Sequence, residues 1–262
     1  MLASYVLRTG FQNDDTLRAA FNALAGEVFG IDFEPWYRRG LWGGQYVPFT
    51  LFDGELAVSS VSANMLDLVL DGKPHKAVQF GTVMTRPEYR NQGLARHLMQ
   101  HAMKTLQDRC DLFYLMGDKH AVGFYRKLGF EAVAESAFTL RLPAAALQWL
   151  EMPAAAPQGL EMPAATPQGL EMPGAGRFLQ PDRPEDMQVI LDAASMRESV
   201  SLTAGVLDAG YLLGFYAMHG FENRFYWIRR TAEGRDHPPV ATGSRFADTD
   251  WLVVFHEADG IL

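Results

Sequence analysis

The stretch Thr85 to Lys104 reads TRPEYRNQGLARHLMQHAMK and joins a polar turn to an amphipathic pattern. Apolar residues recur at every fourth position of this pattern, at Leu94, Leu98, Ala102 and Leu106. The other side is polar and carries Arg96, His97, Gln100, His101 and Lys104. This spacing predicts a helix over residues 94–107 that buries one face.

The turn before this helix suits an anion. Helix N-termini leave backbone N–H groups unpaired and carry partial positive charge, so they bind phosphate. Gly93 lets the main chain approach a ligand closely, Ala95 adds little bulk, and Arg90 offers a guanidinium nearby. The pattern GxxxxGK[ST] is absent, which argues against a Walker-type nucleotide hydrolase, and the absence of GxGxxG argues against a Rossmann site.

Outward from this turn, the pattern predicts a mixed sheet with helices on its faces. Asp53-Gly54 and Asp71-Gly72 predict tight hairpins. We expect strands at residues 2–8, 47–52, 55–65, 66–70, 77–84, 111–116 and 132–142. We expect helices at residues 14–28, capped by Asp14 or Asp15, at 33–41, at 94–107, and at 118–128, ended by Gly129.

A tandem repeat divides the chain. LEMP recurs at Leu150, Leu160 and Leu170, and its prolines exclude a helix. We therefore expect a Pro/Ala-rich linker over residues 143–176, between domains at 1–142 and 177–262. A spacer and a partner-binding strip are both open for it. Beyond the linker we expect a helix over residues 184–194 and strands at Phe225 and Trp251, with no phosphate loop. Such strands need a partner sheet edge.

Composition limits the classes of function. Of the residues, 48% are apolar and 21% charged, which is typical of a packed globule. The net charge of −8 argues against nucleic acid as the main partner. The single Cys110 allows no intrachain disulfide, and no third ligand accompanies His97 and His101, so we expect no metal. No segment has the apolar length of a signal peptide or membrane span, so we expect no membrane partner and a cytoplasmic location.

Two motifs carry a resemblance to a known family. RNQGLA, Arg90 to Ala95, matches the [QR]xxGx[GA] pyrophosphate loop of the GNAT N-acetyltransferases, and AVGFYRKLGF further on resembles their FYxxxGF segment. FEPWYRRGLWGGQYVP and VQFGTVMTRPEYRNQGLA are similar to a bacterial-type GNAT subgroup with an extra C-terminal GNAT-like region. The resemblance covers residues 2–142. It implies an α/β (α+β) fold with a GNAT-like mixed central sheet flanked by helices, followed by a smaller C-terminal α/β region.

The resemblance also implies acetyl-CoA as co-substrate and names residues for it. The backbone of Val83, Met84 and Thr85 would pair with the pantetheine arm, and Tyr125 would protonate the leaving thiolate or hold the sulfur. The loop would hold the pyrophosphate through Arg90, Asn91, Gln92, Gly93, Leu94, Ala95 and Arg96. Asp118 stands where many relatives have an asparagine that contacts the cofactor. An aspartate can cap the helix there but would repel a phosphate.

The sequence indicates the binding site of the amine acceptor less clearly than that of the co-substrate. The region DFEPWYRRGLWGGQY carries two carboxylates, Asp32 and Glu34, and aromatic side chains that suit a cationic amine, among them Trp36, Tyr37, Trp42 and Tyr46. The tryptophans equally suit packing at the sheet edge, and both interpretations stay open. Glu34 and Asp32 are candidate general bases, His75 is a weaker one, and an ordered water is the alternative.

The resemblance thus implies an acyltransferase that moves an acetyl group from acetyl-CoA to a primary amine by direct attack. We expect the acceptor to be a small molecule or a peptide amine, and a homodimer is left open. The alternative is a GNAT-like module that senses acyl-CoA or binds a protein without turnover.

Overall fold

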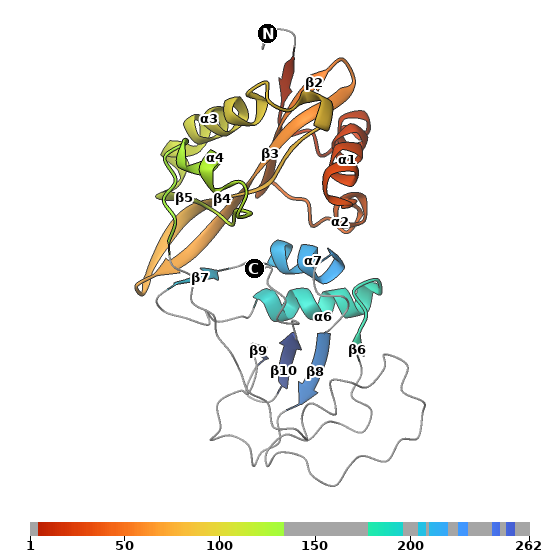
Figure 1. Cartoon of the computed structure of the whole chain (residues 1–262). Helices are drawn as coiled ribbons and strands as arrows, with labels where there is room; N and C mark the ends of the chain where they lie inside the picture. Colours follow the sequence, from red (N-terminus) through yellow and green to blue (C-terminus); the bar gives the residue numbers. More distant parts are fainter. Residues whose placement is uncertain are drawn as a thin grey trace. The chain divides into compact units, whose positions relative to one another are not determined.

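The computed structural model describes residues 5–133, 178–195, 204–207, 210–219, 225–229, 243–246 and 250–254 (Figure 1). The chain forms two compact units. Of the described residues, unit 1 holds 5–133, 204–207 and 210–211, and unit 2 holds the rest. Residues 143–176, the expected linker, lie outside the described residues.

Unit 1 is built on a mixed six-stranded sheet. Its strands are β1 (Val6–Arg8), β2 (Tyr46–Asp53), β3 (Leu56–Leu70), β4 (Lys73–Thr85), β5 (Leu112–Leu115) and β7 (Ala204–Leu207). The order is β1-β2-β3-β4-β5, and β7 pairs with β3 beyond the end of β2. Only the β4–β5 pair is parallel among these strands. The mixed sheet expected from the sequence is confirmed.

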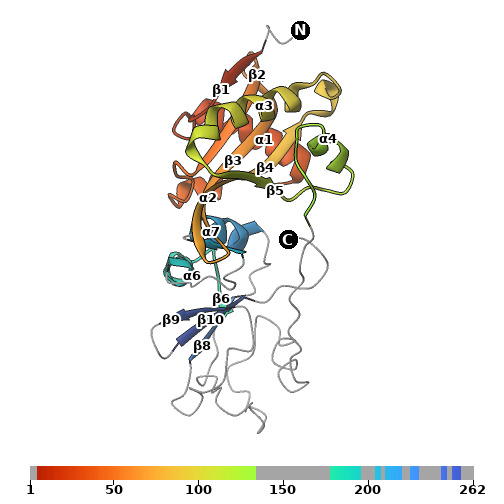
Figure 2. The same cartoon turned by 90° about the vertical axis from the view of Figure 1, so that its left-hand side faces the viewer.

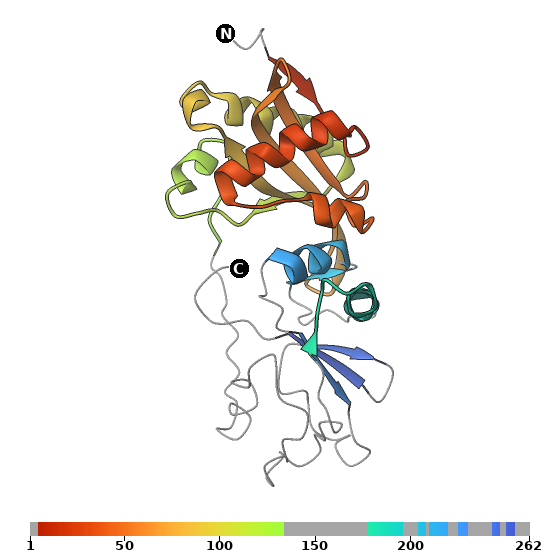
Figure 3. The ribbon, with the colours of Figure 1, turned by 90° about the vertical axis from the view of Figure 1, so that its right-hand side faces the viewer.

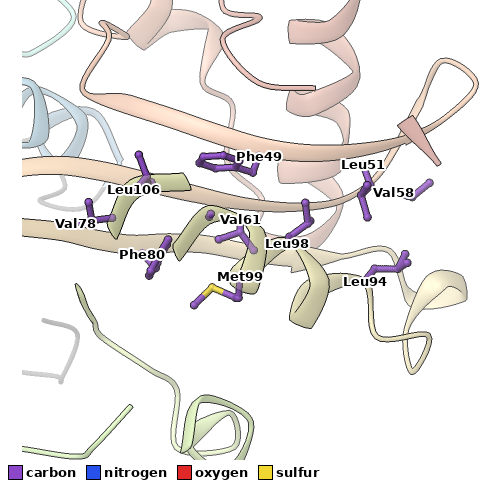
Figure 4. Close-up of a cluster of buried hydrophobic side chains, with 12 residues drawn as sticks. Phe49, Leu51, Val58, Val61, Val78, Phe80, Leu94, Leu98, Met99 and Leu106 are labelled. Carbon is purple, nitrogen blue, oxygen red and sulfur yellow. The ribbon is translucent and has the colours of Figure 1, made fainter. Parts of the chain in front are cut away.

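Helices cover both faces of this sheet. The helices α1 (Asp15–Phe29) and α2 (Glu34–Arg38) lie on one face, and α3 (Leu94–Leu106) lies on the other (Figures 2 and 3). A fourth helix, α4 (Val122–Arg126), follows β5. Under α3 a cluster of buried side chains joins β2, β3 and β4 to the helix (Figure 4). We call it the α3-face cluster, and its members include Phe49, Val61, Val78, Phe80, Leu94, Leu98, Met99 and Leu106.

The local signals of the sequence explain most element ends. Asp14 caps α1, because its Oδ1 accepts from the amides of Thr16 and Leu17, each at 3.0 Å. Asp71 and Gly72 both have positive φ angles, 48° and 74°, as a tight hairpin requires. α4 is shorter than the helix expected over residues 118–128. Residues 132 and 133 form no strand, and the rest of the strand expected over 132–142 lies outside the described residues.

Unit 2 contains an antiparallel sheet in the order β6-β8-β10-β9. These strands are β6 (Phe178–Leu179), β8 (Phe225–Arg229), β9 (Gly243–Phe246) and β10 (Asp250–Val254). α6 (Pro184–Ser195) confirms the expected helix, and its buried Asp186 accepts from the amide of Gln180 at 2.9 Å. α7 (Gly210–His219) begins in unit 1 and continues into unit 2. Within the described ranges, every helix is too short or too polar to cross a bilayer.

Candidate functional site

The turn between β4 and α3 has the backbone of an anion cradle. Pro87–Tyr89 form a short 3-10 turn, and α3 begins at Leu94. Asn91 and Gly93 have φ angles of 62° and 80°, so both adopt a left-handed conformation just before the helix. A Cβ built on Gly93 would meet no atom within 4 Å, and Asn91, Gln92 and Gly93 are exposed. The space above this turn is therefore open to a ligand.

The amides of this turn are available. Arg90 donates its N–H to the carbonyl of Pro87 at 3.3 Å. The N–H groups from Asn91 to Arg96 have no hydrogen-bond acceptor among the residues that the structure describes. α3 also lacks a side-chain cap and an acidic residue in its first turn. These donors and the helix dipole together fit an anion such as a diphosphate.

Two side chains of the turn are already engaged. Arg90 directs its Nε to the carbonyl of Thr85 at 3.2 Å, which ties the turn to the end of β4. The amide group of Gln92 accepts from the hydroxyl of Tyr5 at 3.2 Å and donates to the carbonyl of Glu88 at 3.5 Å. Arg96 is exposed. The contacts of Arg90 and Gln92 hold the shape of the turn and leave its main-chain donors free.

The last residues of β4 present an open backbone edge. β5 pairs with β4 only from Ala77 to Phe80 and ends at Leu115, so residues 81–85 pair with β3 alone. A β-bulge lies within this segment. Ser60 pairs with Met84 and Ser62 with Gly81, so that Thr82 and Val83 together face the single residue Val61. An extended ligand can pair with such an edge.

Tyr125 lies on the face of the sheet to which Val83, a residue of this edge, also points. Its ring packs against the α3-face cluster, as do Val83 of β4 and Phe124 of α4, and Leu94 is part of that cluster. Burial raises the pKa of the Tyr125 hydroxyl, which therefore keeps its proton at neutral pH. The structure thus groups three of the predicted site elements on one face: the strand edge, the phosphate turn and the tyrosine.

Gly117 fixes how closely the chain after β5 approaches Tyr125. A Cβ on Gly117 would lie 3.2 Å from Cδ2 and Cε2 of the Tyr125 ring and 3.2 Å from Cδ1 of Leu115. These distances are shorter than most carbon contacts, so any side chain here would push the ring. Sequence reasoning missed Gly117, whose only signal was a glycine directly after a buried strand.

Glu34 lies with α1 and α2 on the other face of the sheet, in an ion pair. Nε of the buried Arg18 is 2.8 Å from its Oε2, and Arg38 lies 3.2 Å from its Oε1. These hydrogen bonds, with that of Arg18 the largest cause, lower the pKa of Glu34. A lower pKa makes a carboxylate a weaker base. Its predicted role as general base stays a prediction.

Arg18 also contacts an aromatic residue of the region expected to bind the acceptor. Its guanidinium carbon lies 3.8 Å from the centre of the Tyr37 ring. Trp36, Trp42 and Tyr46 are between 1% and 5% exposed. These rings pack inside the protein and offer no open wall for a ligand. The carboxylate and the tyrosine expected to meet a cationic amine thus contact the protein's own arginine, which sequence reasoning missed.

Asp118 directly follows Gly117 and so stands beside this grouping, whereas Asp32 and His75 contact other partners. Asp118 accepts from the amide of His120 at 2.7 Å and stabilises the turn that leads to α4. Asp32 accepts from the amide of Glu34 at 2.9 Å, and His75 lies 3.5 Å from Asp111. Within the described ranges, no three His, Cys, Asp or Glu side chains are grouped to hold a metal ion.

Comparison with known proteins gives this geometry a context. The family model of an acetyltransferase (GNAT) domain matches residues 11–133. A transcriptional regulator from Bacillus halodurans C-125 matches at 23% identity and a TM-score of 0.42, over 52% of this chain and 98% of that chain. Glucosamine-6-phosphate N-acetyltransferase from Arabidopsis thaliana matches at 16% identity and 0.43, over 52% and 97%. An aminoglycoside N-acetyltransferase in complex with CoA matches at 14% and 0.44, over 52% and 94%. No curated protein matches the sequence.

Proposed function

Residues 11–133 of this chain belong to the GNAT acetyltransferase family, and from this premise we propose that the protein is an acetyl-CoA-dependent N-acetyltransferase. The observation that carries the proposal is the turn at Gly93, with its unpaired amides at the start of α3. Its donors fit the diphosphate of CoA, and Arg90 and Arg96 add positive charge beside it.

The open edge of β4 supports the next part of the proposal. Main-chain groups of Val83, Met84 and Thr85 would pair with the pantetheine arm, because β5 does not occupy this edge. The side chain of Met84 is buried, so only its main chain is available. Bound in this way, acetyl-CoA supplies an activated acetyl thioester. The strand amides near the bulge suit the negative charge that develops on the carbonyl oxygen during attack.

Tyr125 is proposed as the general acid. A neutral primary amine attacks the thioester carbonyl, a C–N bond forms and the C–S bond breaks. The thiolate takes the hydroxyl proton of Tyr125, the proton released by the amine passes to water, and Tyr125 regains a proton from water. The Tyr125 hydroxyl is available for this role, since burial raises its pKa and it therefore carries its proton at neutral pH. Direct attack needs no protein base, which agrees with the ion pair that Glu34 already forms.

A thiol-release assay tests this function. Purified protein would be given acetyl-CoA and a panel of amines: polyamines, aminoglycosides, amino acids and peptides with free N-termini. The proposal predicts thiol release that depends on one class of amine and yields an acetylated product by mass spectrometry. Tight CoA binding without turnover for any amine would instead support the sensing module, with which the aspartate at position 118, in place of the family's asparagine, is consistent.

A further inference from the structure

The bulge in β4 changes the face of the sheet to which its side chains point. Successive side chains of a strand point to opposite faces, so residues three apart cannot share a face. Phe80 and Val83 nevertheless both pack against the α3-face cluster. Thr82 instead directs its hydroxyl to Tyr46, whose ring packs with the aromatic side chains beside α1 and α2. The extra residue therefore shifts the alternation of β4 side chains between the two faces of the sheet.

The backbone of Thr82 does not favour this conformation by itself. Its φ angle is 41°, and a β-branched residue rarely adopts a positive φ. Backbone conformations of this kind cost about 1–3 kcal/mol and persist only where surrounding contacts impose them. The structure contains such a contact, because the hydroxyls of Thr82 and Tyr46 are hydrogen-bonded at 3.0 Å.

Tyr46 is itself held rigidly. Its ring stacks on Phe33 with centroids 5.5 Å apart, and it meets Trp36 and Trp42 edge-on at 5.2 and 5.3 Å. The residue is only 5% exposed, and burial raises the pKa of its hydroxyl, which is therefore a neutral hydrogen-bonding group. A phenol fixed on three rings can hold a strand segment in place with little freedom.

We propose that Tyr46 is a positioning residue for acetyl transfer, which acts through Thr82 to fix the bulge that aims the open edge of β4. This inference rests on the proposed function, because that edge is where the thioester would lie. The sequence analysis placed Tyr46 in the region expected to bind the acceptor and assigned no role to Thr82. A small displacement of catalytic groups is costly, since misplacement by about 1 Å lowers rates on the order of 100-fold.

Three single variants and one double variant of the full chain test the inference. Tyr46→Phe removes only the phenol oxygen, Thr82→Val removes the hydroxyl but keeps the branched shape, and Thr82→Ser keeps the hydroxyl. We expect Tyr46→Phe and Thr82→Val each to lower kcat roughly 10- to 100-fold. The double variant should be no slower than either single one, because both break one hydrogen bond. Thr82→Ser should keep most of the activity. The Kd of CoA should change far less than kcat in every variant, because the amides around Gly93 that would hold the diphosphate are not altered.

Hydrogen–deuterium exchange supplies a readout that does not depend on turnover. We expect the peptide that covers residues 79–86 to exchange faster in Tyr46→Phe than in wild type, with α3 unchanged. Wild-type turnover together with unchanged kcat and exchange in Tyr46→Phe would overturn the inference and leave the proposed function standing. A loss of activity in Thr82→Ser equal to that in Thr82→Val would also overturn it. A wild type without amine-dependent thiol release would refute the proposed function and this inference with it.

Discussion

At the scale of single residues, Tyr125 is the most direct test of the chemistry. Tyr125→Phe keeps the ring contacts with Phe124 and Phe130 but removes the proton donor. Loss of a general acid lowers rates by about 10²-fold or more, so kcat should fall by that factor while the KM of acetyl-CoA changes little. Thiol release measures both, and thermal melting checks that the variant is folded. Full activity in Tyr125→Phe would contradict the assignment.

The pH dependence of kcat gives a second test of Tyr125 as the general acid. Burial raises its pKa above the ordinary tyrosine value of about 10. The acid form is therefore present at all lower pH values and is lost only as pH rises through the raised pKa. We expect the wild-type kcat to decline only above about pH 10, and this decline to be absent in Tyr125→Phe.

Gly117 tests whether the position of the tyrosine ring matters. Gly117→Ala places a methyl group 3.2 Å from the Tyr125 ring, so we expect kcat to drop about 10-fold or more as the ring moves. Gly123→Ala is the matched control, because a Cβ at this position in α4 meets nothing within 4 Å. The control should keep its activity and gain at most about 1 kcal/mol of stability. Equal activity of the two variants would show that Gly117 does not set the ring.

At the scale of elements, the ion pair between Arg18 and Glu34 joins α1 to α2. Glu34→Gln leaves the buried guanidinium with weaker partners, which should cost about 2 kcal/mol in the free energy of unfolding at pH 7. Because the folded state lowers the pKa of Glu34, this stabilisation is present above the unfolded-state pKa of about 4.3 and is lost as pH falls below it. Urea unfolding of both proteins should therefore converge toward pH 3.

Glu55→Gln, which changes an exposed carboxylate in the β2–β3 hairpin turn, serves as the control and should alter stability little. The same variants decide whether Glu34 is a base. If Glu34→Gln lowered kcat steeply and left the unfolding free energy unchanged, the structural account of this ion pair would be wrong, and the role as general base would gain support.

The sequence predicts those helices and turns whose positions depend on residues close together in the chain. Asp14 or Asp15 marked the start of α1, the Asp-Gly pairs marked both hairpins, and the four-residue spacing from Leu94 marked α3. The bulge at Thr82 had no such signal, because neither threonine nor valine favours the positive φ that tertiary contact imposes there. The ion pair of Arg18 likewise had no local signal, since its partner Glu34 lies 16 residues further along the chain.

At the scale of the whole molecule, unit 1 includes residues from beyond the expected linker. β7 pairs with Asp67–Leu70 of β3, and the backbone carbonyl of Tyr211 accepts from Nε1 of Trp36 at 3.2 Å. The Tyr211 hydroxyl donates to Asn64 at 3.4 Å. Strand pairs between segments this far apart in sequence have no local signal, which is why sequence reasoning placed no strand at residues 204–207. The domain boundaries at 142 and 177 stay a prediction.

A truncation tests the role of this returning segment. A chain of residues 1–142 lacks β7 and Tyr211, so it leaves the edge of β3 open and Nε1 of Trp36 without its partner. We expect the unfolding free energy to fall by about 2 kcal/mol or more, with a tendency to aggregate through the open edge. In the full chain, Tyr211→Phe should cost about 1 kcal/mol. Identical melting curves for the truncated and full chains would contradict this account.

The claim on which the proposed function depends is that main-chain amides around Gly93 hold the diphosphate of CoA. Titration of ¹⁵N-labelled protein with CoA, followed by amide NMR, measures this directly. The account predicts large, saturable shifts for the amides of residues 91–96, and similar but weaker shifts with pyrophosphate alone. CoA binding that leaves these amides unchanged and shifts signals elsewhere in the chain would contradict it.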